Sequence, residues 1–371
     1  METNETDLLE MLNGAKKVFL LEPPYRRKYV PLGLAKIASY IKGKNTRFPP
    51  RREVEFGRTY TGGSDLICCT TLFTHDAAEV NKALDGCRFM APGVPIVAGG
   101  VLASLMPDRL PDVTVFRGYS KILDQCIPDY SMNWEIEPEW EEFSFTFTTR
   151  GCPNRCPYCA VHRIEKEQWV IPNWRDHIID SKPCAMISDN NLSAYPEHLI
   201  EVAQYLKEKK KKVVFDNGLD CKLITPEIAK TLAGLRYVRA GLRLAFDRIE
   251  EDGVFQAAVR MLIGAGVSPR SIMSYVLYNY RDTPHEADYR MRECVKLGIR
   301  PYPQRYQPIS GELVEPREFV GKHWTHNLAR LFRYYWLMAG RYNKYGFEEW
   351  MRTQTEYKVA EADINIWSMI Q

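Results

Sequence analysis

Strand-like and helix-like segments alternate along most of this chain, and this alternation constrains the fold more than any other feature. Parallel strands connected by helices are the usual result of such alternation. In the first part of the chain the expected strands are 17–21, 65–70, 95–97 and 113–116, and the expected helices are 32–41 and 76–84. The sequence therefore predicts an α/β fold that begins with a Rossmann-like, doubly wound sheet over residues 1–130. The Pro- and Gly-containing segment 46–63 is expected to be a loop.

An acidic segment, 131–142, is expected to be a linker to a second α/β region. The strand expected at 143–149 is followed by further strand–helix units, about six in all up to residue 310. This number of units predicts a partial (β/α)6 barrel over residues 143–310. Residues 311–371 are rich in aromatic side chains and are expected to form a helical C-terminal extension.

Charge and hydropathy argue against several classes of protein. The 371 residues include 50 Lys and Arg against 47 Asp and Glu, a formal charge of +3, so a dedicated nucleic-acid binder is not indicated. No apolar run is long enough to span a bilayer, and the polar, acidic N-terminus does not resemble a signal peptide. We therefore expect a cytoplasmic protein with no membrane partner. In that reducing compartment its ten cysteines are expected to bind metal, perform chemistry or fill the core.

Three of the cysteines form a motif, C-x3-C-x2-C, directly after an expected strand. They are Cys152, Cys156 and Cys159 in the sequence RGCPNRCPYCAVHR. Three thiolates on one loop suit an iron–sulfur cluster, zinc or copper(I). His162 follows closely, so a Cys3His zinc site is an alternative. The alternative function is a non-catalytic scaffold protein that holds zinc or an iron–sulfur cluster. In a 4Fe–4S cluster, three cysteines would leave one iron without a protein ligand.

With this motif after a strand and before a series of βα units, the chain resembles the radical S-adenosylmethionine (radical SAM) enzymes. Up to about residue 310 it is similar to their subgroup with an N-terminal cobalamin-binding-like domain. The residues that carry this likeness are Pro23-Pro24, PLGLA at 31–35, Gly99-Gly100 and the RGCPNRCPYC loop.

The resemblance implies a reaction. Cys152, Cys156 and Cys159 would ligate three irons of a 4Fe–4S cluster, and S-adenosylmethionine would chelate the fourth. Reductive cleavage of S-adenosylmethionine would yield a 5′-deoxyadenosyl radical that abstracts hydrogen from a substrate the sequence does not name. An external electron donor such as flavodoxin or ferredoxin is implied as a partner.

The resemblance also implies cofactor-binding positions. Tyr158 would lie near the adenine, and Asp189, Asn190 and Asn191 near the methionine end. Asp247 falls where relatives contact the ribose, and Tyr278 begins the segment YNYRDT, where relatives have a glycine-containing turn that contacts adenine. The alternative for Asp189–Asn191 is a plain strand-to-helix turn with Asn191 as the helix cap, and for Asp247 it is capping. Arg243 is a candidate because a guanidinium inside a strand needs a partner.

Cobalamin is the less secure of the implied cofactors. Gly99-Gly100 is present and residues 70–72 suit a second cobalamin motif, but the first motif, Asp-x-His-x-x-Gly, is absent, and His75 follows the wrong strand. Either cobalamin binds without a protein histidine, or the lobe is a vestigial Rossmann-like domain. Bound cobalamin would favour methyl transfer, whereas its absence leaves rearrangement, oxidation or group insertion open.

Overall fold

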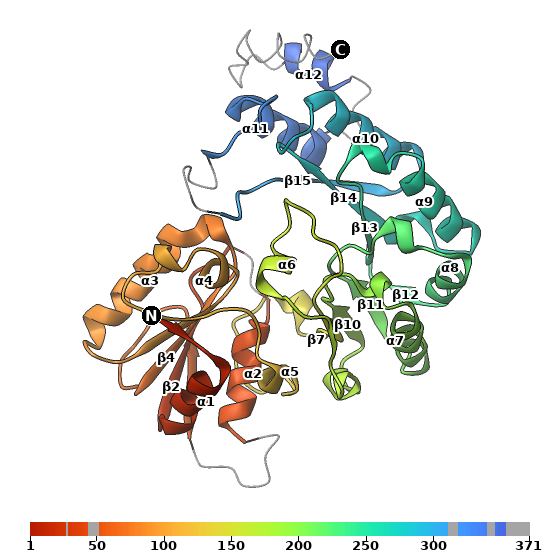
Figure 1. Cartoon of the computed structure of the whole chain (residues 1–371). Helices are drawn as coiled ribbons and strands as arrows, with labels where there is room; N and C mark the ends of the chain where they lie inside the picture. The colour runs from red at the N-terminus through yellow and green to blue at the C-terminus, as the bar shows by residue number, and fades with distance from the viewer. Residues whose placement is uncertain (27–28, 44–51, 311–317, 340–345, 354–371) are drawn as a thin grey trace. The chain divides into compact units, whose positions relative to one another are not determined.

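The computed structural model describes residues 1–26, 29–43, 52–310, 318–339 and 346–353. The chain forms two compact units (Figure 1). The N-terminal unit contains Met1–Pro183 and Pro308–Pro316, and the C-terminal unit contains Cys184–Gln307 and Arg317–Gln371. Both units are built from parallel strands and helices, which confirms the predicted α/β class.

The N-terminal unit has a six-stranded parallel sheet in the order β1-β6-β5-β4-β2-β3. Its strands are β1 (Glu2–Thr3), β2 (Lys17–Leu21), β3 (Glu53–Gly57), β4 (Leu66–Thr71), β5 (Ile96–Gly100) and β6 (Thr114–Phe116). Strand β3 corrects the loop expected over 46–63, of which residues 46–51 lie outside the described residues. Its sequence EVEFG alternates polar and apolar residues, as suits a half-buried strand at the edge of a sheet.

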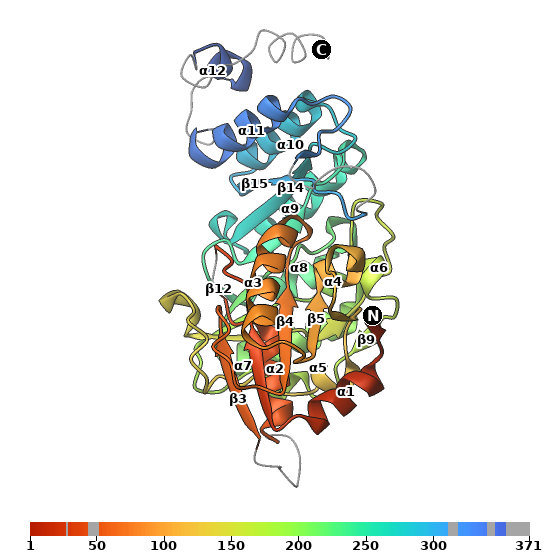
Figure 2. The same ribbon diagram turned by 90° about the vertical axis from the view of Figure 1, so that its left-hand side faces the viewer.

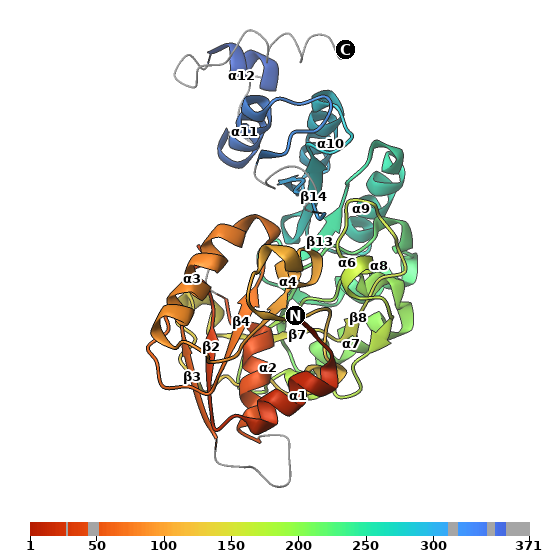
Figure 3. The same ribbon diagram turned by 60° about the vertical axis from the view of Figure 1, so that its left-hand side comes forward.

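Helices cover both faces of this sheet. They are α1 (Glu5–Gly14), α2 (Leu32–Ile41), α3 (Ala77–Met90), α4 (Val101–Leu105) and α5 (Lys121–Asp124). Phe19 and Leu21 of β2 pack in one cluster with residues of α3 and α4. Val18 and Leu20, which point to the opposite face, are fully buried as well. Figures 1 and 3 show α1 and α2 on the side of the sheet away from α3.

The segment 131–142, expected to be a linker, is packed against the unit by its aromatic residues. Trp134 is buried, and its indole N–H donates to the carbonyl oxygen of Asp129 at 2.6 Å. A short 3-10 turn, Pro138–Trp140, leads into β7 (Phe143–Thr146) and β8 (Thr149–Arg150). Strand β8 pairs antiparallel with β9 (Trp169–Val170), and α6 (Val161–Ile164) lies between them in the sequence.

The C-terminal unit repeats a strand–helix pattern. Its strands are β10 (Cys184–Ile187), β11 (Lys212–Phe215), β12 (Arg236–Tyr237), β13 (Leu242–Ala245), β14 (Ile272–Tyr278) and β15 (Arg300–Arg305). The pairs among β10, β11 and β12 and among β13, β14 and β15 are parallel. The two groups adjoin, because the Phe215 N–H donates to Gly241 O at 2.8 Å and the Leu219 N–H donates to Arg243 O at 2.8 Å. The helices are α7 (Pro196–Glu208), α8 (Pro226–Ala233), α9 (Val254–Gly264) and α10 (Pro284–Lys296).

The described part of the C-terminal extension is helical and packs through aromatic rings. It comprises α11 (His326–Tyr334), a π-helical turn at Tyr335–Ala339 and α12 (Phe347–Thr353). Helices α10 and α11 lie against β15, as Figures 1 and 2 show. Phe332 is fully buried between Trp324 and Phe347, with ring centroids 5.3 and 5.5 Å away. No helix within the described residues is both long and apolar enough to cross a bilayer.

Candidate functional site

The three motif cysteines lie on the loop between β8 and α6. Cys152, Cys156 and Cys159 are partly exposed, whereas the other seven cysteines of the chain are buried. The Cys159 N–H donates to the carbonyl oxygen of Cys156 at 3.0 Å, which closes a tight turn between these two residues. The chain therefore presents thiols on this loop and uses its other thiols as small core residues.

The start of this cysteine loop is fixed at Gly151. Its φ is +79°, and a Cβ at this position would lie 2.2 Å from the carbonyl oxygen of Glu167 on the neighbouring segment. The Gly151 N–H donates to Glu165 Oε2 at 2.6 Å. Only glycine meets both the backbone conformation and the close approach without strain. The backbone entering Cys152 therefore has a defined direction.

Buried ion pairs connect the start of the cysteine loop to helices α2 and α5 of the N-terminal unit. Arg150 donates from Nε and Nη2 to the two carboxylate oxygens of Asp124, both at 2.8 Å, and from Nη1 to Glu165 Oε1 at 3.1 Å. The Lys36 ammonium of α2 donates to Asp124 Oδ1 at 2.8 Å and is 2% exposed. Burial alone would raise the pKa of Asp124, but the two cations hold it below its ordinary value. Asp124 is therefore an ionised bridge between α2 and the cysteine loop.

A cavity of about 190 Å³ lies beside Cys152, lined also by His162, Glu165 and Lys166. The imidazole Nδ1 of His162 is buried and has no hydrogen-bond partner within the described part of the chain. Burial, together with Arg163 and Arg155, lowers the pKa of His162, which favours the neutral imidazole. A neutral imidazole with a free nitrogen beside a thiol is chemically able to act as a metal ligand.

The donor set of the cysteine loop fits a soft metal centre. Three partly exposed thiols on a turn with no regular secondary structure provide sulfur ligands for iron or zinc. Within the described residues, no three His, Cys, Asp or Glu side chains converge closely enough to enclose a metal ion. The fit therefore rests on the type and exposure of the donors and requires the cysteine loop to close around the metal. Tyr158 lies on the same loop and is half-buried.

Asp189, Asn190 and Asn191 follow β10 directly in the C-terminal unit, and Asp189 and Asn191 are buried. The Ser193 hydroxyl donates to Asn191 Oδ1 at 2.7 Å and accepts the Asp220 N–H at 2.9 Å. The Asn191 side chain makes no capping hydrogen bond to the 3-10 turn that it precedes. Asn191 therefore stands at the cap position of this 3-10 turn without a side-chain capping bond, and the Ser193 hydroxyl joins the turn to the loop of Asp220.

Arg243 lies on β13 and has two polar partners. It donates to the Tyr275 hydroxyl on β14 at 2.6 Å and forms an ion pair with the carboxylate of Asp216, just after β11. These contacts supply the partner that a buried guanidinium requires. Asp216 and Tyr275 are site candidates that the sequence reasoning missed. Asp216 had a signal, because it is an acidic residue directly after a buried strand, where parallel sheets bind ligands.

Asp247 follows β13 and is held by one backbone N–H and one side-chain carboxylate. Its Oδ1 accepts the Leu277 N–H at 3.1 Å, and its own N–H donates to Glu251 Oε2 at 3.0 Å. Burial, and after it the Glu251 carboxylate, raises the pKa of Asp247 to about 7. A carboxyl that titrates near neutral pH at a strand end is a typical functional-site feature, although structural networks also produce one.

Tyr278 belongs to the aromatic core rather than to a polar site. Its side chain is fully buried, its hydroxyl donates to Ala329 O at 3.1 Å, and its ring packs against Trp324 and Phe332. This burial argues against a contact between the ring and a cofactor. The loop after Tyr278 is held by Arg290, which is fully buried and pairs with Asp282 at 2.7 Å.

The predicted residues divide between the two units. The three cysteines and Tyr158 belong to the N-terminal unit, and Asp189–Asn191, Arg243, Asp247 and Tyr278 belong to the C-terminal unit. Within the C-terminal unit, Asn217 joins the loops after β10 and β11 by donating to Ser188 O at 2.7 Å. Polar residues thus follow β10, β11 and β13, at the carboxyl ends of three parallel strands of the C-terminal unit.

The residues of the N-terminal lobe do not fit a histidine-ligated cobalamin. The order of the sheet reverses at β2, and the crevice between β2 and β4 is where such a fold would place a ligand. Tyr25 occupies that position, because its hydroxyl donates to Thr70 O and accepts the Leu72 N–H, both at 3.1 Å. Gly100 has a packing role, since a Cβ there would lie 2.4 Å from Thr71 O. His75 stacks on Phe73 after β4.

Comparisons with known proteins do not identify a family. No family model and no curated protein sequence matches the chain. One solved structure with a partial likeness is the carboxyl transferase domain of Rhizobium etli pyruvate carboxylase with pyruvate. It is 12% identical with a TM-score of 0.18, and the match covers 99% of this chain and 50% of that one. The chain thus spans about half of that structure, and a likeness this low carries no argument about fold or function.

Proposed function

We propose that this protein is a radical SAM enzyme whose cluster is bound by Cys152, Cys156 and Cys159. The observation that carries the proposal is the contrast among the cysteines: these three are partly exposed on one loop, and the other seven are buried. Bound there, a 4Fe–4S cluster would supply the electron that cleaves S-adenosylmethionine to a 5′-deoxyadenosyl radical, which abstracts hydrogen from the substrate.

The chain's own residues have roles in this proposal that follow from their places. Gly151 and the ion pairs of Arg150 set the direction of the cysteine loop. In the proposed partial barrel, the polar residues after β10, β11 and β13 would line the carboxyl edge, where α/β barrels bind ligands. Asp189 and Asn191 would orient the methionine end of S-adenosylmethionine, and Asp247 its ribose. The electron would come from an external donor such as flavodoxin or ferredoxin.

Methyl transfer is the less favoured outcome of this reaction. It would require cobalamin, and Tyr25 occupies the crevice between β2 and β4 in the sheet lobe. We therefore favour an oxidation, a rearrangement or a group insertion, each of which needs only the radical and a substrate with an abstractable hydrogen.

A second function is a non-catalytic zinc scaffold, and His162 is the observation that favours it. His162 lines the same cavity as Cys152, and its Nδ1 has no hydrogen-bond partner among the described residues, so three thiols and one imidazole would form a closed tetrahedral set. A closed set leaves no open position for chemistry. The scaffold therefore predicts zinc that requires His162 as a ligand, whereas the radical SAM enzyme predicts iron that does not.

Metal analysis of anaerobically purified and reconstituted protein separates the two functions. The radical SAM proposal predicts about four irons and four sulfides per chain, lost in Cys156→Ala and kept in Cys87→Ala, a matched change of a buried cysteine on α3. It also predicts that His162→Ala keeps its iron. One zinc per chain that is lost in His162→Ala would contradict the proposal and support the scaffold.

A further inference from the structure

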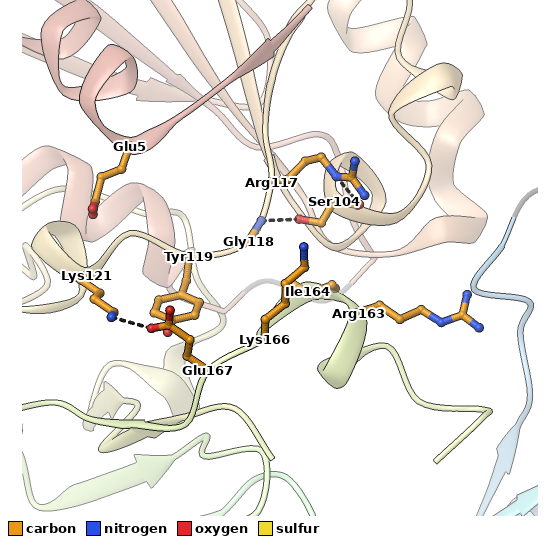
Figure 4. Close-up of a pocket in the computed structure, with 10 residues that line it drawn as sticks. All are labelled: Glu5, Ser104, Arg117, Gly118, Tyr119, Lys121, Arg163, Ile164, Lys166 and Glu167. Carbon is orange, nitrogen blue, oxygen red and sulfur yellow. Dashed lines mark hydrogen bonds and ion pairs between the residues drawn. The ribbon is translucent and has the colours of Figure 1, made fainter. Parts of the chain in front are cut away.

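A cavity of about 470 Å³ lies at the carboxyl edge of the N-terminal sheet, beside α6 and the segment that follows the cysteine loop (Figure 4). One wall is formed by Glu5 after β1, Ser104 on α4 after β5, and Arg117 directly after β6. The other wall is formed by α6 and the residues that follow it. Parallel sheets bind ligands at this edge. The cavity thus joins a typical ligand-binding position to the segment that follows the cysteines.

The carboxylates of this cavity are already engaged by protein groups. Glu5 accepts hydrogen bonds from the Ser120 hydroxyl and, at 3.1 Å, from the Ile122 N–H at the start of α5. Glu167 forms an ion pair with Lys121 at 2.6 Å. Glu5 keeps its charge but is held by these neutral donors, whereas the charge of Glu167 is matched by Lys121. Of the four cationic side chains that line the cavity, Arg117 pairs with Glu2 at 2.5 Å and Lys121 with Glu167, which leaves Arg163 and Lys166.

Lys166 is a cation of the cavity without such a partner. It forms no ion pair with any residue in the described ranges, and neither does Arg163 on α6. In Figure 4 the Lys166 side chain rises toward the segment of Arg117 and Gly118, whereas Arg163 extends away from it. The cavity is lined by four cations and two acids, so an ammonium that is directed into it and has no carboxylate partner attracts an anion.

The same cavity has a small apolar wall. The Tyr119 ring and Ile164 line it, and the ring stacks nearly parallel on Trp169, with centroids 6.2 Å apart. A cavity with a fixed aromatic ring and an unpaired ammonium suits a ligand with both a carbon skeleton and a negative charge. An inorganic anion would satisfy the ammonium but would have no carbon skeleton to pack against the aromatic ring.

Lys166 also lines the smaller cavity, of which Cys152 forms part of the wall, so this side chain borders both cavities. We propose that the larger cavity binds a small organic anion, carrying a carboxylate or phosphate, and that this anion is the substrate. The substrate assignment rests on the proposed radical SAM function. In this arrangement Lys166 binds the charged end of the substrate, and the rest of the molecule extends along Tyr119 and Ile164 toward the cysteine loop.

Isothermal titration of the full chain tests the site. Inorganic pyrophosphate and citrate serve as probes at low ionic strength, because one carries phosphate groups and the other carboxylates. We expect saturable binding of at least one probe, about tenfold weaker in Lys166→Gln and restored to within about threefold in Lys166→Arg. Lys82→Gln, an exposed change on α3, is the matched control and should bind like the wild type. The tighter probe shows which class of anion the cavity takes.

Two results would overturn the site: no saturable binding of either probe, or equal affinity in the wild type and Lys166→Gln. Cluster and 5′-deoxyadenosine assays on the same wild-type protein separate this inference from the proposed function. If the cluster and 5′-deoxyadenosine form but no probe binds, the anion site is wrong and the radical SAM function stands. If Lys166-dependent binding occurs and the wild type assembles no cluster even after anaerobic reconstitution, the site stands and its substrate assignment falls.

Discussion

At the scale of single residues, Gly151 is the position where the cysteine loop tolerates least change. Alanine there would combine an unfavourable positive φ with a Cβ 2.2 Å from Glu167 O. We expect Gly151→Ala to lower the free energy of unfolding by roughly 2 kcal/mol and to reduce cluster assembly. Gly86 on α3 is the matched control, because a Cβ at that position would have no neighbouring atom within 4 Å. Gly86→Ala should stabilise the protein by up to ~1 kcal/mol. Urea unfolding of both variants measures the contrast, and equal effects would contradict it.

Asp247 gives a prediction about pH. An unfolded chain ionises this carboxyl near pH ~4, whereas the folded protein does so at about 7. The folded state therefore holds an extra proton between these values, and stability from this group falls as pH rises from about 4 to about 7. Asn cannot ionise and still offers an oxygen to the Leu277 N–H. The stability of Asp247→Asn relative to the wild type should thus rise by roughly 2 kcal/mol between pH 5 and pH 8.

Urea denaturation of both proteins at pH 5 and pH 8 measures this difference. Asp7→Asn, at an exposed residue of α1, is the control and should shift little with pH. A stability difference between Asp247→Asn and the wild type that is the same at both pH values would show that Asp247 is ionised throughout this range.

At the scale of elements, the contact between α2, α5 and the cysteine loop depends on one carboxylate. Removing the charge of Asp124 leaves Lys36 and Arg150 buried without their shared partner. We expect Asp124→Asn to destabilise the protein by about 3 kcal/mol, as is typical when half of a buried ion pair is lost. Asp85→Asn, which breaks the exposed pair with Arg88, should change stability by less than about 1 kcal/mol.

Thermal and urea unfolding of Asp124→Asn and Asp85→Asn compare the buried with the exposed ion pair. The spectrum of the reconstituted cluster in Asp124→Asn adds a readout of loop position that stability alone does not give. If both variants unfold like the wild type, Asp124 does not bridge the lobe and the loop as an ion.

Regular elements could be predicted from the sequence wherever the pattern was local. Strand β2 and helix α2 have the predicted bounds, because β2 is a short apolar run followed by Pro23 and Pro24, and α2 has apolar residues at helical spacing after Pro31. Strand β3 was missed because an edge strand with charged residues resembles a loop. The bridge of Lys36, Asp124 and Arg150 was not predictable, since its members lie more than 20 residues apart and meet only after folding.

At the scale of the whole molecule, the C-x3-C-x2-C spacing is the sequence feature on which the proposed function mainly depends. It identified three thiols that the structure leaves accessible. Asp189 and Tyr278 were candidates because the resemblance implies cofactor contacts at strand ends, and Arg243 because a guanidinium inside a strand needs a partner. Arg243 and Asp189 do lie among polar groups of the C-terminal unit, whereas the fully buried ring of Tyr278 belongs to the aromatic core. Position along a strand therefore indicates the edge of the sheet and does not show whether a side chain faces core or ligand.

The central claim is that the cysteine loop holds a cluster that cleaves S-adenosylmethionine. Anaerobically reconstituted, reduced protein is incubated with S-adenosylmethionine, and 5′-deoxyadenosine is measured by mass spectrometry. We predict its formation in the wild type and in Cys87→Ala, and its loss in Cys156→Ala. Formation of 5′-deoxyadenosine at the wild-type level in Cys156→Ala, or none from wild type that carries a full cluster, would contradict the claim.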